Sequence, residues 1–246
     1  MNSVPASIST NFYPASQDVD LNKQLRLTSF LQKSQEAAEA HATLYGCGYN
    51  HLIEQNIVWV LSRLQIEIGR MPEWLEPVRL DTWHKRVDRI FALRDFILYD
   101  AKERPMVWAT TAWLLMDIGS RRMQRVEHIL PHLSRVNINQ DAIETLPDKL
   151  TAPQELALNH IHIVRFSDLD LNNHVNNTKY VEWALDCLPF EKWSNQTISS
   201  FQINFNTEAR YNDSVELLYA ALDGQTHYVE GRRNSQNLFQ AICQFK

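Results

Sequence analysis

An internal repeat constrains the fold of this 246-residue chain more than any other feature. Residues 18–22 read DVDLN and residues 168–172 read DLDLN, at an offset of 150. A second stretch aligns at an offset of 137, where Gln65-Ile66 pairs with Gln202-Ile203. Two matches in the same order, both preserving apolar positions, indicate that one structural unit occurs twice.

Each copy has the same predicted plan, in which a helix is followed by several strands. In the first copy, apolar and small residues recur at helical spacing from Phe30 through Leu44 to Tyr45, and Gly46 is a natural stop. In the second, the helical pattern runs from Tyr180 to Leu188, and Pro189 is expected to end it. Period-two patterns then predict strands, with one face formed by Val58, Val60, Leu64, Ile66 and Ile68 in the first copy and by Phe201, Ile203 and Phe205 in the second.

Further strands are predicted from the segments FALRDFILY, MVWATTAWLLM, VELLYAAL and LFQAICQF. The stretch from Pro131 to Pro153, with scattered Asn, Asp and Pro, is typical of a connection between halves. We therefore expect an N-terminal repeat with its linker at 1–153 and a C-terminal repeat at 154–246. A helix followed by antiparallel strands, made twice, is an α+β layout, and a long helix wrapped by such a sheet is a hotdog. The fold expected is a double hotdog, because two unrelated α+β domains would leave the repeat unexplained.

Composition excludes several classes of protein. A net charge of -5 argues against general nucleic-acid binding, and no stretch approaches the ~18 apolar residues of a membrane span. The first residues, MNSVPASIST, lack the basic and apolar regions of a signal peptide. Cys47, Cys187 and Cys243 are odd in number and widely spaced, so they predict neither a disulfide framework nor a zinc site. We expect a cytoplasmic setting and no metal or cofactor.

The two copies differ in their titratable residues. Gln24 stands where the second copy has His174, and Met71 stands where it has Glu208. Aspartate and asparagine before a helix can simply cap its free N–H groups, so for Asp168 a structural role and a functional one both stay open. Asp170 is the better functional candidate, because a carboxylate near an imidazole can orient it. A histidine and a glutamate that are absent together from the other copy indicate a functional site in the second.

This inventory suits hydrolysis. A helix N-terminus offers unpaired N–H donors and a partial positive charge, which can polarise a carbonyl and stabilise the oxyanion formed on attack. Histidine exchanges protons near neutral pH, and a carboxylate can activate a water. The polar cluster therefore predicts a hydrolytic site that needs no metal.

The segment DLDLNNHVNNTKYVEW, residues 168–183, closely resembles the signature of the acyl-acyl carrier protein thioesterases, a family of plant plastid enzymes and bacterial relatives. The resemblance extends to WVLSRLQIEI, VRLDTWHKRV, RDFILYD and NTEARYNDSVEL, and it covers nearly the whole chain from about Asn11. It implies a double hotdog fold. It also implies hydrolysis of fatty acyl-acyl carrier protein to free fatty acid and holo carrier protein, which ends chain elongation in fatty acid synthesis.

By this resemblance the catalytic residues are Asp170, Asn172, His174 and Glu208. Glu208, or His174 with Asn172, would activate a water, and Asp170 would orient the Asn/His end. The main-chain N–H groups of Val175 and Asn176 are expected to stabilise the oxyanion. Plant members carry a cysteine after the glutamate, where this chain has Ala209. The missing transit peptide indicates a bacterial, cytoplasmic protein.

The first copy, having no titratable pair, is expected to supply the acyl-chain pocket. Trp59, Trp83 and Trp113 are interpreted as core residues. Arg121, Arg122 and Arg125 form a basic cluster that could meet an acidic carrier protein, although a solvated face is the simpler interpretation. The expected partner is acyl carrier protein with a phosphopantetheine-linked acyl chain, and a homodimer is allowed but not required. The alternatives are a hotdog acyl-CoA thioesterase and a noncatalytic acyl-binding hotdog protein.

Overall fold

The computed structural model describes residues 4–133, 136, 138 and 140–246. The chain divides into two compact units, residues 1–147 and 148–246. The sequence placed this boundary after residue 153, so residues 148–153, which were expected in the first repeat, belong to the second unit.

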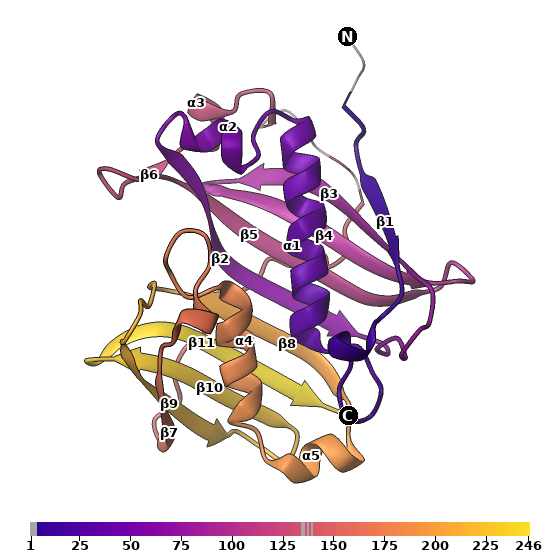
Figure 1. The fold of residues 1–246 in the computed structure, drawn as a ribbon, viewed down its shortest axis with the longest axis vertical. Coiled ribbons are helices and arrows are strands. Elements are labelled where there is room, and N and C mark those ends of the chain that lie inside the picture. Colours follow the sequence, from indigo (N-terminus) through magenta and orange to yellow (C-terminus); the bar gives the residue numbers. More distant parts are fainter. Residues whose placement is uncertain (1–3, 134–135, 137, 139) are drawn as a thin grey trace. The chain divides into compact units, whose positions relative to one another are not determined.

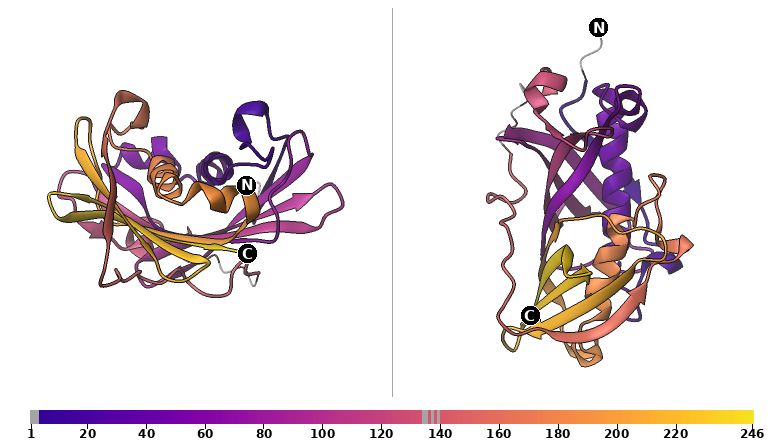
Figure 2. Two further views of the ribbon diagram at one scale, coloured as in Figure 1. Left: turned by 90° about the horizontal axis from the view of Figure 1, so that it is seen from below. Right: turned by 90° about the vertical axis from the view of Figure 1, so that its left-hand side faces the viewer.

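The first unit is an antiparallel sheet that curves around one long helix (Figures 1 and 2). Its helices are α1 (Leu27–Leu44), α2 (Tyr49–Ile53) and α3 (Val126–Ile129). Its strands are β1 (Ile8–Phe12), β2 (Ile57–Ile68), β3 (Val78–Asp88), β4 (Phe91–Asp100), β5 (Pro105–Asp117) and β6 (Met123–Gln124). They are arranged in the order β1-β3-β4-β5-β2, and β6 pairs with β5.

The second unit has the same design. Its helices are α4 (Asn177–Asp186) and α5 (Phe190–Asn195), and its strands are β7 (Ala157–Ile163), β8 (Ile198–Phe205), β9 (Ser214–Ala221), β10 (Thr226–Arg233) and β11 (Gln236–Phe245). Their order is β7-β9-β10-β11-β8. This is the order of the first unit when β1 to β5 are matched with β7 to β11 in sequence. The two units therefore share one strand topology. The predicted strand segments FALRDFILY, MVWATTAWLLM, VELLYAAL and LFQAICQF correspond to β4, β5, β9 and β11.

The segment that leads into each long helix is also built twice. A 3-10 turn at Ser16–Asp18 has its counterpart at Phe166–Asp168. The N–H of Arg26 donates to the Asp18 carbonyl at 2.8 Å, and the N–H of Asn176 donates to the Asp168 carbonyl at 2.8 Å. The offset of 150 residues thus relates equivalent backbone positions.

The long helices are where the sequence placed them, with two corrections. In α1 the predicted apolar face is buried, but Leu44, assigned to it, is 53% exposed at the last turn, after which Gly46 takes a φ of +68°. The helix α4 ends at Asp186, earlier than expected, because Pro189 begins the short helix α5 instead of ending α4. Within the described part of the chain, no helix is long and apolar enough to cross a membrane.

The predicted inner face of β2 was wrong in its first half. A β-bulge between Leu61 and Arg63 shifts the pairing with β5 by one residue. Because side chains alternate along a strand, the shift moves the following residues to the opposite face. Ile57 and Leu61 are therefore buried with Leu64, whereas Val58 and Val60 lie on the opposite face from Leu64, Ile66 and Ile68.

The connection between the units contains no α-helix or strand among its described residues from Pro131 to Pro153; residues 134–135, 137 and 139 of this predicted linker lie outside the description. A buried charged group anchors the later part to β3 and β4. Lys85 donates to the Ile143 carbonyl at 2.8 Å and pairs with Asp95 at 3.2 Å. Asp95 in turn accepts the N–H of Ala142 at 2.8 Å. Because both charges are buried and satisfied, this part of the linker is fixed to the first unit.

Candidate active site

The loop before α4 is held by Asp170. Its Oδ1 accepts the backbone N–H of Asn172 at 2.8 Å and that of His174 at 3.3 Å, while its own N–H donates to the His174 carbonyl at 2.8 Å. Asn173 takes a φ of 60°, a left-handed conformation that asparagine tolerates. Asp170 therefore orients His174 through the backbone and not, as the sequence suggested, through the imidazole.

His174 and Glu208, which are distant in sequence, meet at this loop. His174 Nε2 lies 3.4 Å from Glu208 Oε2, and the two side chains are 20% and 30% exposed. The N–H of Val175 donates to the Ala209 carbonyl at 3.0 Å, which joins the helix entry to the segment that carries the glutamate. The two titratable residues missing from the first repeat thus form one partly solvated pair.

Asn172 and Asp168 lie in contrasting surroundings. Asn172 is exposed, and its one hydrogen bond within the described residues is from its backbone N–H to Asp170. Asp168 is 5% exposed, and its Oδ2 accepts the N–H of Arg165 at 2.8 Å and lies 3.0 Å from His162 Nε2. Asp168 is therefore a structural residue of the turn, whereas the Asn172 side chain is open to solvent.

The main-chain donors predicted for the oxyanion are already used. Besides the Val175 bond to Ala209, the N–H of Asn176 donates to the Asp168 carbonyl. Both N–H groups belong to the hydrogen bonds that shape the helix entry, so in this structure neither is free to donate to an oxyanion. Asn176 caps α4 by accepting the N–H of Thr178 at 2.9 Å, and no described residue accepts the N–H of Asn177. The free donor of the first turn is thus Asn177.

A residue that sequence reasoning did not single out completes the site's support. Tyr180 is buried, and its hydroxyl accepts the N–H of Ala209, next to Glu208, at 2.8 Å. Burial raises the pKa of the Tyr180 hydroxyl, so it stays protonated. The repeat held the signal: Phe30 replaces Tyr180 in the first copy, and Pro72, which has no N–H, replaces Ala209. The tyrosine hydroxyl is thus present in the copy that has a backbone N–H to accept from, and absent in the copy that has a proline.

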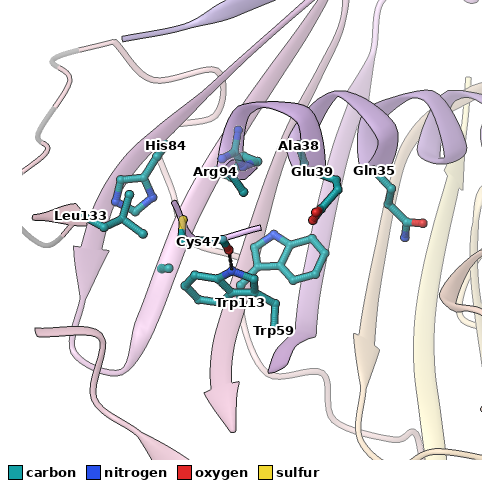
Figure 3. Close-up of a pocket in the computed structure, with 11 residues that line it drawn as sticks. Gln35, Ala38, Glu39, Cys47, Trp59, His84, Arg94, Trp113 and Leu133 are labelled. Carbon is teal, nitrogen blue, oxygen red and sulfur yellow. Dashed lines mark hydrogen bonds between the residues drawn. The ribbon is translucent and has the colours of Figure 1, made fainter. Parts of the chain in front are cut away.

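The first unit contains a separate pocket of about 100 Å³ beneath α1 (Figure 3). Its walls include Trp59 and Trp113, whose indole N–H groups are held by the Cys47 carbonyl and the Thr111 hydroxyl, both at 2.9 Å. These two tryptophans are therefore pocket residues and not simply core. Trp83 is a core residue, 2% exposed.

Two family models match the chain: the acyl-ACP thioesterase N-terminal domain over residues 6–131 and the acyl-ACP thioesterase C-terminal domain over residues 151–245. The chain belongs to the acyl-ACP thioesterase family. Oleoyl-acyl carrier protein thioesterase 2 of Arabidopsis thaliana is 28% identical over 86% of the chain. The chain spans 62% of that plant protein, which is less than two thirds.

Solved structures agree with the family assignment. An acyl-ACP thioesterase from Bacteroides thetaiotaomicron is 25% identical, with a TM-score of 0.86 over 98% of both chains. The 12:0-ACP thioesterase from Umbellularia californica has 20% identity and a TM-score of 0.86 over 100% of this chain and 99% of that one. The chain therefore has the double hotdog fold that the sequence predicts.

In this family member the three cysteines are free and buried. Burial raises the pKa of the Cys47 thiol to about 11 and that of Cys187 to about 12. Burial also raises the pKa of Cys243. A nucleophilic cysteine needs a lowered pKa, so the environment of each thiol opposes that role.

Proposed function

We propose that this protein hydrolyses the thioester of fatty acyl-acyl carrier protein to free fatty acid and holo carrier protein, which ends chain elongation. The observation that carries this proposal is the 3.4 Å pair of His174 and Glu208 in one unit, at positions that are Gln24 and Met71 in the other. Family membership supplies the substrate class.

The proposed reaction uses water as the nucleophile. The water oxygen bonds to the thioester carbonyl carbon while the His174–Glu208 pair takes its proton, and the carbonyl oxygen becomes an oxyanion. The free N–H of Asn177, at the positive end of α4, is placed to stabilise that charge. The tetrahedral intermediate then expels the phosphopantetheine sulfur, which receives the proton. Asp170 positions His174, and the exposed Asn172 amide orients the water.

We further propose that the pocket of the first unit holds the acyl chain. It lies entirely within residues 35–133, and its walls include two tryptophans, three alanines and a leucine. Such a lining favours hydrocarbon, because burial of apolar surface contributes roughly 25 cal/mol per Å². The division of labour would place chain recognition in the first repeat and hydrolysis in the second.

The proposed setting is a bacterial cytoplasm. Three free cysteines suit a reducing compartment, and the Bacteroides thetaiotaomicron relative matches this chain over 98% of its length. The partner proposed is acyl carrier protein, with no nucleic acid. All four candidate catalytic residues lie in one chain, so a homodimer is allowed by the fold but not needed for the site.

Turnover on matched substrates tests the function. The protein should release fatty acid from acyl-acyl carrier protein with a higher kcat/KM than from the same acyl chain on coenzyme A. Equal or faster hydrolysis of the coenzyme A ester would assign the chain to the rival acyl-CoA thioesterase class. Binding of acyl chains without release of thiol from either ester would identify a noncatalytic acyl-binding protein.

A further inference from the structure

The pocket under α1 contains a buried cation without a counter-ion. Arg94 is 8% exposed and lines the pocket. Its Nη1 lies 3.2 Å from His41 Nδ1 and 3.2 Å from the Thr82 hydroxyl, so both contacts are with uncharged groups. No carboxylate of the described residues pairs with Arg94, and none of the residues outside the description is Asp or Glu. The guanidinium keeps its Nε and Nη2 donors for a ligand.

The contact with His41 leaves the positive charge uncompensated. His41 Nε2 lies 2.9 Å from the Pro5 carbonyl and so carries the proton, which makes Nδ1 an acceptor for Arg94. The histidine is therefore neutral. Burial also lowers the pKa of His41, which is consistent with this state.

A second unpaired polar group lies beside Arg94. His84 is 3% exposed, lines the same pocket, and its Nε2 has no hydrogen-bond partner among the described residues. His84 and Arg94 are paired residues of β3 and β4. Directly opposite side chains project from the same face of a sheet with Cβ atoms ~5 Å apart, so one small group can contact both.

The other ionisable groups at the pocket form no ion pair with Arg94 within the described residues. The Cys47 thiol is protonated, because burial raises its pKa to about 11. Glu39 is exposed on α1, where its Oε1 accepts the N–H of Tyr49 at 2.8 Å and the Thr43 hydroxyl at 3.3 Å. In Figure 3, Glu39 and Gln35 are to one side of the two indoles and His84 is to the other. The pocket is thus apolar in its walls and cationic at one buried position.

We propose that this pocket binds a carboxyl group attached to a hydrocarbon chain, with Arg94 and His84 as the residues that recognise it. A buried charge without a partner is unfavourable, and an anionic ligand compensates it where a neutral one would not. A carboxylate also satisfies both side chains, since one oxygen accepts from the Arg94 guanidinium and the other accepts from His84 through a proton on Nε2. The hydrocarbon chain of the ligand then lies against the indoles of Trp59 and Trp113.

Two molecules carry this chemistry. One is a free fatty acid, the product of the proposed reaction, which would then bind back to the enzyme. The other is an acyl chain with a second carboxyl at its far end. Recognition of the carboxyl is the same in both.

Titration calorimetry with octanoate and with 1-octanol tests the proposal directly. The wild-type protein should bind octanoate more tightly than 1-octanol. Arg94→Met should weaken octanoate binding by at least about tenfold, because it removes a charge-assisted hydrogen bond, and should leave 1-octanol binding unchanged. Arg63→Met is the matched control: Arg63 is also on the first sheet, but it donates to the Pro147 carbonyl and does not line the pocket. Its octanoate affinity should equal that of the wild type.

Equal affinity of the wild type for octanoate and 1-octanol would overturn the proposal, as would undiminished octanoate binding by Arg94→Met. If Arg94→Met does not fold, His84→Leu keeps the test open, since it should weaken octanoate binding and leave 1-octanol binding unchanged. Undiminished octanoate binding by His84→Leu would then overturn the assignment.

Turnover assays then identify the source of the carboxyl, and only these rest on the proposed function. Inhibition of acyl-carrier-protein hydrolysis by octanoate, relieved in Arg94→Met, would assign the pocket to the free product. Faster hydrolysis of an ω-carboxyoctanoyl ester than of the octanoyl ester, reversed in Arg94→Met, would assign it to a dicarboxylic acyl chain. A protein that shows no turnover but binds octanoate through Arg94 would refute the proposed function and leave this inference standing.

Discussion

Asp20 in the first unit and Asp170 in the second make the same hydrogen bonds. Asp20 Oδ1 accepts the N–H groups of Asn22 at 2.8 Å and Gln24 at 3.0 Å, as Asp170 does for the residues two and four positions later. Yet only the second loop presents a histidine to a glutamate. The loop is therefore a structural device that both repeats need, and the chemistry depends on two side chains placed upon it.

The two loops also differ in the number of backbone contacts that join them to the neighbouring segment. In the first unit the N–H of Trp74 donates to the Lys23 carbonyl at 2.8 Å, and Gln24 forms a bridge with Glu73. Within the described residues of the second unit, the equivalent position at Tyr211 makes no such bond. The second loop is thus less tightly joined to its neighbouring segment at the point where His174 meets Glu208.

The largest expected effect comes from removing the titratable pair. His174→Ala and Glu208→Gln should each lower kcat by ~10²–10⁴, the usual contribution of a general acid or base. The matched changes in the first unit, Gln24→Ala and Met71→Ala, should leave kcat near the wild-type value. Steady-state turnover, with circular dichroism to confirm folding, measures the difference. Similar losses from both sets would show that the halves do not differ in chemistry.

Substitution of Asp20 and of Asp170 distinguishes an effect on stability from an effect on catalysis. Asp20→Ala and Asp170→Ala each remove a charged acceptor of two N–H groups, so both should lower the free energy of unfolding by about 1–3 kcal/mol. Only Asp170→Ala should also lower kcat, by up to ~10², because it frees the backbone of His174 and misplaces the imidazole. Denaturant unfolding and turnover give the two readouts. A kcat unchanged in folded Asp170→Ala would remove the positioning role.

Tyr180 and Phe30 provide a smaller test of the same comparison. Tyr180→Phe leaves the buried N–H of Ala209 without an acceptor and should cost about 1–3 kcal/mol of unfolding free energy. Phe30→Tyr should also destabilise, because it adds a hydroxyl at a fully buried position, and Pro72, the counterpart of Ala209, has no N–H to donate to it. Chemical denaturation checks both. A neutral Tyr180→Phe would mean that the hydrogen bond contributes nothing to stability.

Much of the fold could be predicted because the repeat records it twice. The turns at Asp20 and Asp170 depend on local hydrogen bonds to an aspartate side chain. The two copies therefore have the same residue types at these positions. The bulge between Leu61 and Arg63 left no such mark, since a bulge is set by the pairing of β2 with β5 and not by its own residues.

The sequence indicated which side chains form the candidate site, but not which backbone N–H groups are free to donate a hydrogen bond there. His174 and Glu208 stand out because the other copy lacks them. Which N–H groups are free depends on long-range backbone bonds, such as that from Val175 to Ala209, which no local pattern encodes. The charge in the first unit was missed for a similar reason: Arg94 is an ordinary strand residue until the fold buries it without a carboxylate.

The smallest effect on activity is expected from the cysteines, which are the residues most easily mistaken for nucleophiles. At a pKa of about 11, the Cys47 thiol is ionised in only about one molecule in ten thousand at pH 7. Cys187 forms the C-terminal cap of α4, at the opposite end from His174, and Cys243 lies buried in β11.

A variant with all three cysteines changed to Ala should lose stability, because each change deletes a buried sulfur. Its kcat should nevertheless stay near the wild-type value, whereas adding Glu208→Gln to the same background should abolish turnover. Trapping of an acyl-cysteine by mass spectrometry, or inactivity of the folded triple variant, would replace activated water with a covalent mechanism and place the nucleophile outside the His174–Glu208 pair.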